Sequence, residues 1–297
     1  MDFYSRILAE ISKIDEVGSD YEIVFVDDGS PDSSLTTAVK LSEKNGNVKV
    51  VELSKNHGHH RAMMIGMEHA LGERVFLVDC DLEEPPENLS IFWKLMCEDG
   101  EVDLVYGVQE EKQANGLRKI LSQSFYKVFN SLSNVKIPGN ELVSRLMKRN
   151  YVNALLEYKE RELFISGIWA DVGFRRKEVL TQKEYNGNSS YTLAKRLTMA
   201  IDAVTSFSTK PLLYVFYLGF FVSMLSLASA CYLVINKLLF GTVVDGWTSI
   251  LVSLYLIGGI IIFCIGAVGL YLSRVFSEVK QRPLSIVRKV HQRENVR

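Results

Sequence analysis

The sequence predicts an α/β fold, with a mostly parallel sheet and helices on both of its faces, followed by two transmembrane helices. The first observation is that strand-like and helix-like stretches alternate over residues 2–106, as they do in a parallel sheet with crossover helices. The second is that two long runs, Pro211–Asn236 and Gly246–Ser273, contain no charged residue. Each run can cross a bilayer core of about 30 Å, and soluble domains rarely bury helices this long that are apolar all round.

The elements of the domain follow one another in a regular order. Apolar residues recur at helical spacing over Asp2–Val17, which predicts a first helix. Short apolar runs predict strands at Glu22–Val26, Val48–Leu53, Val75–Val78 and Asp103–Tyr106. Helices are expected between these strands, from Ser33 or Ser34 through Lys44, over Ala62–Leu71 and near Leu89–Met96.

Charge sets the expected orientation in the membrane. Lys237 and Asp245 are the charged residues between the two apolar runs, whereas many bases follow the second run: Arg274, Lys280, Arg282, Arg288, Lys289, Arg293 and Arg297. Such an excess marks the cytoplasmic side, so the tail and the N-terminal domain are both expected in the cytoplasm. The expected division is a cytoplasmic domain (1–190), an amphipathic juxtamembrane helix (191–210), transmembrane helices (211–236 and 247–273) and a basic tail (274–297).

Composition narrows the class of protein. A formal net charge of −1 over 297 residues gives no reason to expect nucleic acid as a partner. The four cysteines stand far apart, which fits a reducing compartment without a disulfide framework: Cys80, Cys97, Cys231 and Cys264. The first residues lack the basic and apolar pattern of a signal peptide. Glycines in the second apolar run permit close helix packing, so a homo-oligomer is left open.

Acidic residues follow two of the predicted strands. Asp79 and Asp81, with Glu83 behind them, come where the strand at Val75–Val78 should end. Ligands of open α/β sheets collect at the carboxyl ends of strands, and carboxylates there suit a hard divalent cation that also holds phosphates. For this stretch alone, a solvated acidic turn closed by two prolines is the alternative.

A second polar cluster has the same placement. Residues 27–30, Asp-Asp-Gly-Ser, follow the strand at Glu22–Val26, and Gly29 permits a conformation that other residues resist. A turn that satisfies only its own backbone is the alternative. Residues 54–61 form a polar loop with three histidines, whose spacing does not fit a zinc site. We expect that loop to face a phosphate or a sugar.

These motifs together resemble those of family 2 glycosyltransferases. The stretches 26–32 (Val-Asp-Asp-Gly-Ser-Pro-Asp), 54–59 (Ser-Lys-Asn-His-Gly-His) and 79–87 (Asp-Cys-Asp-Leu-Glu-Glu-Pro-Pro-Glu) occur in the family's order. The resemblance is to the polyprenyl-phosphate branch, which includes dolichyl-phosphate mannose synthase and bacterial undecaprenyl-phosphate glycosyltransferases. It continues through 145–149, 187–191 and 206–211 into the apolar runs, so it covers nearly the whole chain.

The resemblance implies a GT-A-like fold of the nucleotide-diphospho-sugar transferases and a site at the strand ends. The residues it implies for nucleotide-sugar binding are Asp27, Asp28, Asp79 and Cys80. The implied cofactor is Mg²⁺ or Mn²⁺, with Asp79, Asp81 and Glu83 as ligands, and the implied catalytic residues are Asp81 and Arg145. Candidates for the acceptor phosphate are Arg118, Arg149, Lys183 and Ser189; solvated surface charge is the alternative for the basic ones.

The implied reaction is metal-dependent transfer of a sugar from a nucleotide-sugar to polyprenyl phosphate, with inversion, in cell-envelope or O-antigen-type glycan synthesis. The implied setting is a bacterial inner membrane, with the bilayer itself as a partner. A polysaccharide-directed transferase is disfavoured because no Gln-x-x-Arg-Trp motif occurs and further spans are lacking. A non-catalytic homologue that serves as a membrane scaffold is the alternative from another class.

The sequence also departs from the family pattern. No Pro-x-Tyr-Asn-Glu strand precedes the first predicted helix, so the family's first strand is expected to be absent, and we expect the true start to lie upstream. Val143 stands where many relatives carry an acidic residue, and Ser190 replaces the lysine of the common Ser-Lys-Tyr. Gln109 stands where an arginine is frequent.

Overall fold

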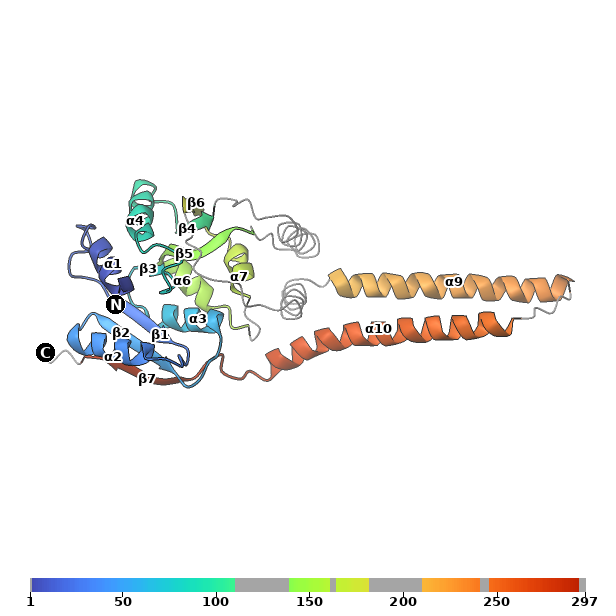
Figure 1. Ribbon diagram of the computed structural model, residues 1–297. Helices are drawn as coiled ribbons and strands as arrows, with labels where there is room; N and C mark the ends of the chain where they lie inside the picture. The colour runs from blue at the N-terminus through green and yellow to red at the C-terminus, as the bar shows by residue number, and fades with distance from the viewer. Residues whose placement is uncertain (1, 110–138, 161–163, 182–209, 241–245, 294–297) are drawn as a thin grey trace.

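The computed structural model describes residues 2–109, 139–160, 164–181, 210–240 and 246–293 (Figure 1). The helices are α1 (Asp2–Ile11), α2 (Ser34–Lys44), α3 (His59–His69), α4 (Asn88–Glu98), α6 (Arg149–Leu156), α7 (Ile165–Asp171), α9 (Lys210–Phe240) and α10 (Trp247–Val279). The strands are β1 (Ile23–Asp27), β2 (Val48–Leu53), β3 (Arg74–Leu77), β4 (Leu104–Gln109), β5 (Glu141–Lys148), β6 (Arg176–Thr181) and β7 (Val287–Gln292).

The strands form two mixed sheets, of order β1-β2-β7 and β3-β5-β4-β6. β1 pairs with β2, and β4 with β6, in parallel, whereas β2–β7, β3–β5 and β4–β5 are antiparallel. The prediction of a mostly parallel sheet is therefore wrong for the described strands. The reason is that β5 and β7, neither of which was predicted as a strand, both run against their neighbours.

Helices cover both faces of the β3-β5-β4-β6 sheet, as expected. Neighbouring strand residues point to opposite faces. Leu104, Tyr106 and Met147 pack against α3, α6 and α7 in one core cluster. Val105 and Leu146 pack against α1 and α4 in another. α1 ends at Ile11, earlier than the predicted helix, and short turns follow it.

β1 and β3 each pair on one side only, among the strands that the structure describes. Helix α3 contacts both of them and so bridges the two sheets. β2 pairs on both sides, and all of its residues are buried, whereas every residue of β3 is only half-buried. The two sheets are thus held together by packing of α3, and by loops described below, rather than by a shared ladder.

The long helices α9 and α10 project from the α/β domain side by side, and the chain then returns to the domain as β7 (Figure 1). Within the described residues, one stretch is long and apolar enough to cross a membrane, Leu256–Val279, with a mean hydropathy of 2.3 and none of its window buried. Lys210–Val222 is a shorter apolar segment. The prediction of two spans stays a prediction.

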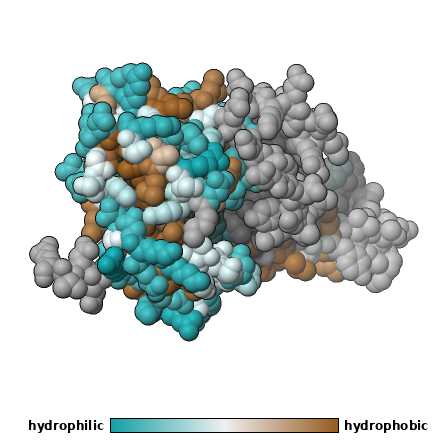
Figure 2. Space-filling view, turned by 60° about the vertical axis from the view of Figure 1, so that its left-hand side comes forward, coloured by the Kyte–Doolittle hydropathy of each residue, from teal (hydrophilic) through white to brown (hydrophobic). Residues whose placement is uncertain are grey.

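The surface of the α/β domain differs in polarity from that of the long helices α9 and α10. On the face shown in Figure 2, hydrophilic residues cover most of the described α/β domain, with smaller hydrophobic patches between them. The large apolar side chains that are exposed lie mainly on α9 and α10, where residues such as Phe216, Phe221 and Ile262 are more than half exposed. Exposed apolar surface of this extent marks a region that contacts a membrane or another protein.

Candidate functional site

The turn after β1 is built around the carboxylate of Asp27, which is buried. Its Oδ2 accepts the backbone N–H groups of Gly29 and Ser30 at 3.2 and 3.4 Å. Gly29 has a φ of +73°, and a Cβ there would lie 2.8 Å from the backbone nitrogen of Asn56. The position therefore requires glycine for two reasons, its backbone conformation and the close approach of the loop at residues 54–58.

Asp28 joins that turn to the loop before α3. Its Oδ1 accepts the backbone N–H of His57 at 2.6 Å, and its Oδ2 accepts that of Gly58 at 2.8 Å. Gly58, with a φ of +98°, is the residue from which α3 begins. Each carboxylate oxygen has two lone pairs, so Asp28 can still accept a hydrogen bond from a ligand while it holds the loop.

The turn after β3 leaves its carboxylates more open. Asp81 is exposed, and its Oδ1 accepts the backbone N–H of Glu83 at 2.9 Å. Asp79 is half-buried, with Oδ1 3.5 Å from Nε2 of His59. Leu82, which follows Asp81, has a φ of +63°, a left-handed conformation that costs a residue with a Cβ about 1–2 kcal/mol. Backbone strain of this kind collects at functional sites.

Glu84 fixes this second turn to strand β5. The residue is 1% exposed, and its two oxygens accept the backbone N–H groups of Val143 and Ser144 at 3.0 and 2.6 Å. Glu84 was not a predicted site residue, because nothing in the stretch 83–84 tells which glutamate turns inward. It ties the acidic turn to the start of β5, where Val143 stands in place of the acidic residue of many relatives.

His59, at the start of α3, brings the two turns together. Desolvation lowers the pKa of its imidazole, and the charges of Asp81, Asp28 and Glu84 act in the opposite direction. The loop before α3 was expected to face a ligand, but the sequence did not single out which histidine lies beside the acidic pair. His59 lies 3.5 Å from Asp79 and feels the charges of Asp28 and Asp81, so the turns that follow β1 and β3 lie close to one another.

Cys80 lies exposed between the two aspartates. Partial desolvation of the thiol, and then the negative charge of Asp79, raise its pKa. The side chain therefore stays a neutral thiol at pH 7 and has no feature of a reactive cysteine. Its expected contact with a nucleotide-sugar stays a prediction.

Arg145, the other residue expected to be catalytic, is 1% exposed. Its guanidinium donates to the carbonyl oxygens of Val143 and Leu142 at 3.0 and 2.7 Å and lies over the ring of Trp169. Burial lowers its pKa to about 10, so it is still a cation at pH 7. The structure thus places this charge inside the domain, where its described contacts hold the first residues of β5.

Of the predicted acceptor residues, Arg149 is the one that the structure describes, and it does not lie at the acidic turns. Arg149 begins α6, and its Nε donates to the carbonyl of Gly72 at 2.9 Å, just before β3 begins. The acidic turn follows the other end of β3, so Arg149 and Asp79 lie at opposite ends of that strand. The other three candidates, Arg118, Lys183 and Ser189, lie outside the described residues.

The donor set fits a magnesium or manganese ion that is shared with a ligand. Among the described residues, no group of three or more His, Cys, Asp or Glu side chains is arranged to hold a metal by itself. Mg²⁺ commonly uses one or two carboxylates, with water and substrate phosphates completing its octahedron. Asp79 and Asp81 would supply two such carboxylates, and the backbone N–H of Glu83 donates to Asp81. The ligand role of Glu83 stays a prediction.

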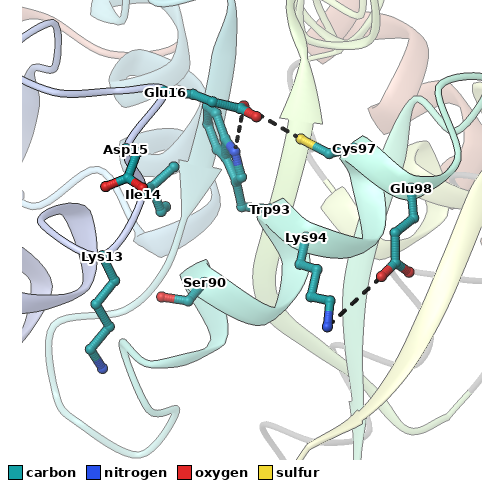
Figure 3. Close-up of a pocket in the computed structure, with 9 residues that line it drawn as sticks. All are labelled: Lys13, Ile14, Asp15, Glu16, Ser90, Trp93, Lys94, Cys97 and Glu98. Atoms are coloured by element: carbon teal, nitrogen blue, oxygen red, sulfur yellow. Dashed lines mark hydrogen bonds and ion pairs between the residues drawn. The ribbon is translucent and has the colours of Figure 1, made fainter.

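A separate groove of about 580 Å³ lies between the segment after α1 and helix α4 (Figure 3). Trp93 donates from Nε1 to Glu16 at 3.1 Å and so joins the two sides of the groove, and Lys94 lies 3.9 Å from Glu98 on the α4 side. α4 covers the opposite face of the sheet from α3. None of the acidic residues of the two turns lines this groove, so it is distinct from the candidate site.

The comparisons with known proteins decide the family. The family model described as glycosyl transferase family 2 matches residues 6–156, which include both acidic turns and β5. This chain belongs to glycosyltransferase family 2. Its two mixed sheets and covering helices are accordingly a GT-A-like glycosyltransferase fold.

Relatives of this glycosyltransferase match nearly its whole length. It is 41% identical over 291 residues to a protein described as putative glycosyltransferases from Mycobacterium tuberculosis, covering 98% of this chain and 84% of that one. It is 36% identical over 273 residues to an uncharacterized glycosyltransferase of Synechocystis, covering 90% and 84%. It is 33% identical over 276 residues to a prophage-derived bactoprenol glucosyl transferase of Shigella flexneri, covering 91% and 88%.

Proposed function

We propose that this glycosyltransferase moves a sugar from a nucleotide-sugar to a polyprenyl phosphate at the cytoplasmic face of a bacterial inner membrane. The observation that carries the proposal is that the two acidic turns, after β1 and after β3, both lie close to His59. Its Nε2 is 3.5 Å from Asp79, and the negative charges of Asp81 and Asp28 act on its ring. The likeness to a bactoprenol glucosyl transferase supports the lipid acceptor.

The first turn suits the nucleoside of the donor. Asp28 is held by two backbone amides, so its carboxylate is fixed in direction while lone pairs remain for a base N–H or a ribose hydroxyl. A side chain whose position is set before binding loses little conformational entropy on binding. Asp27 supports this geometry from inside the turn.

The second turn suits the diphosphate. Asp79 and Asp81 together would hold Mg²⁺ or Mn²⁺ against the two phosphates. The ion would neutralise charge that develops on the leaving nucleoside diphosphate. Because a lipid phosphate is already an oxyanion at pH 7, it attacks the anomeric carbon without a strong general base, and a single displacement inverts that carbon. Positioning and charge neutralisation then dominate catalysis, which agrees with Val143 in the place of an acidic residue.

The membrane helices would bring the acceptor to the domain. We include both α9 and α10 as spans, because both are long and expose large apolar side chains along most of the parts described. With both helices spanning, the domain before α9 and the strand after α10 lie on the same side. A phosphate carried at the headgroup level could then reach the domain without leaving the membrane.

The test is transfer by the full chain in nanodiscs that contain undecaprenyl phosphate. We expect radiolabel from one nucleotide-sugar of a panel to enter the lipid fraction, only with Mg²⁺ or Mn²⁺, and to be lost in Asp81→Ala. Glu98→Ala is the matched control, since Glu98 is an exposed acid at the end of α4 that lies 3.9 Å from Lys94, away from the turns. The absence of transfer from every donor, with a chain that is folded by circular dichroism, would favour the non-catalytic scaffold.

A further inference from the structure

The strand β7, which follows the membrane helices, completes the β1-β2-β7 sheet. It pairs antiparallel with β2 from Lys49 opposite Gln292 to Leu53 opposite Val287, with a shift in register at Glu52/Leu53. Nε2 of His291 donates to the carboxylate of Glu52 at 3.0 Å, and Arg288 lies 3.2 Å from the same carboxylate. These contacts bind the end of the chain to a strand that lies more than two hundred residues earlier.

Just before β7, the backbone reaches the loop that Asp28 holds. The carbonyl of Ile286 accepts the N–H of Ser54 at 2.9 Å, and the N–H of Ile286 points to Nε2 of His57 at 3.4 Å. The Ser54 hydroxyl lies 3.2 Å from the same ring nitrogen. With Nε2 accepting, the proton of the neutral ring lies on Nδ1. The backbone N–H of His57 in turn donates to Asp28.

We propose that residues 280–292, which include β7, form a strap: a segment that connects the membrane helices to the donor site and fixes the position of the loop at residues 54–58. Ile286 and His57 are its positioning residues. The path runs from α10 through residues 280–286 to Ile286, then through the ring of His57 to its backbone and to Asp28. Seven residues span at most about 25 Å, so the strap also limits how far the two acidic turns can move from the end of α10. The role in donor binding rests on the function proposed above.

The geometry distinguishes a strap from a mere cover for the edge of β2. A cover needs only the ladder between β2 and β7, which ends at Val287. The contacts of Ile286 lie beyond that ladder and go to the loop, including one to a side chain. If they act as proposed, loss of the His57 contact loosens residues 54–58 while leaving β2 protected.

The test compares Ile286→Pro with Ile286→Ala in the full chain in nanodiscs. Proline removes the N–H that His57 accepts but keeps the carbonyl, whereas alanine keeps both and removes a side chain that is 56% exposed. His57→Ala removes the contact from the other end without a proline. We expect hydrogen exchange at residues 54–58 to be about three- to tenfold faster in Ile286→Pro and His57→Ala than in wild type and Ile286→Ala.

The Michaelis constant for the donor should rise by a similar factor in those two variants, with kcat unchanged. The double variant Ile286→Pro/His57→Ala should add little to either single one, because both break the same contact. Equal exchange in Ile286→Pro and Ile286→Ala, or additive effects in the double variant, would overturn the strap. Hydrogen exchange is measured without substrate and therefore tests the strap by itself. A wild-type chain that transfers no sugar contradicts the proposed function but not the strap.

Discussion

The turns after β1 and after β3 have similar residues, but their carboxylates differ in hydrogen bonding. Each follows a strand, carries two aspartates and contains a residue with positive φ, Gly29 in the first and Leu82 in the second. In the first turn, both carboxylates accept backbone N–H groups. In the second turn, Asp81 is exposed and accepts the N–H of Glu83 within the turn, whereas Glu84, three residues later, accepts the N–H groups of Val143 and Ser144 in β5.

The difference shows that the carboxylates that stabilise the backbone and those that remain available to a ligand are different residues. A carboxylate whose two oxygens both accept backbone N–H groups, such as Asp28, is fixed in place and adds rigidity. An exposed carboxylate with one backbone contact, such as Asp81, has more lone pairs left for a ligand. The first turn therefore shapes a pocket, and the second provides charge to it. Glu84 lets the second turn do this, because a buried acid replaces the support that Asp27 and Asp28 give to the first.

The largest expected effect is on activity, in the pair Asp81→Asn and Asp28→Asn. Asp81→Asn should lower transfer by about a thousandfold, the scale for losing one charge-stabilising group, with the unfolding midpoint unchanged. Asp28→Asn keeps one acceptor oxygen but loses one loop contact, so it should lower both the donor affinity and the unfolding midpoint. Transfer assays and thermal unfolding in nanodiscs measure the two quantities. A stability loss in Asp81→Asn would mean that the second turn is also structural.

The next effect is on stability, in Glu84→Ala. This change leaves the backbone N–H groups of Val143 and Ser144 buried without their acceptor, which should cost about 2–4 kcal/mol of unfolding free energy. The neighbouring Glu83→Ala should cost under about 1 kcal/mol if its carboxylate serves a ligand rather than the fold. Denaturant unfolding of the full chain measures both. Equal losses in the two variants would remove the division of tasks between these glutamates.

A smaller effect is expected at Leu82, where the second turn uses a leucine in a conformation that favours glycine. Leu82→Ala removes the side chain and keeps the left-handed backbone, whereas Leu82→Gly removes the side chain and the strain together. The glycine variant should therefore be the more stable of the two by about 1 kcal/mol. Equal unfolding free energies would show that the turn relaxes without strain, and the contrast with Gly29 would then disappear.

Much of this arrangement was predictable from sequence because it depends on short apolar runs. Such runs located the strands that precede both turns, and the acidic clusters could be placed at the carboxyl ends of those strands. What could not be predicted depends on partners distant in sequence. β7 reads Val-Arg-Lys-Val-His-Gln, a basic stretch that was taken as a tail, and only its pairing with β2 makes it a strand. The burial of Glu84 similarly depends on the distant amides of β5.

The smallest expected effect concerns pH and the edge of the first turn, where Glu52 pairs in register with Asp27. The hydrogen bond from His291 and, more weakly, the charge of Arg288 hold the pKa of Glu52 below its ordinary value of 4.5, against partial desolvation. An acid with a lowered pKa stabilises the fold above its unfolded-state pKa, and this contribution is lost as the pH falls through the lowered value. The unfolding midpoint of Glu52→Gln should thus lie below that of wild type at pH 7, and the difference should shrink as the pH falls below about 4.5.

In a His291→Ala background, Glu52→Gln should lower the midpoint much less than it does in wild type, since the main partner of the carboxylate is already gone. A difference that persists unchanged on acidification would show that β7 is held by its ladder alone, and that the support of the first turn ends at β2.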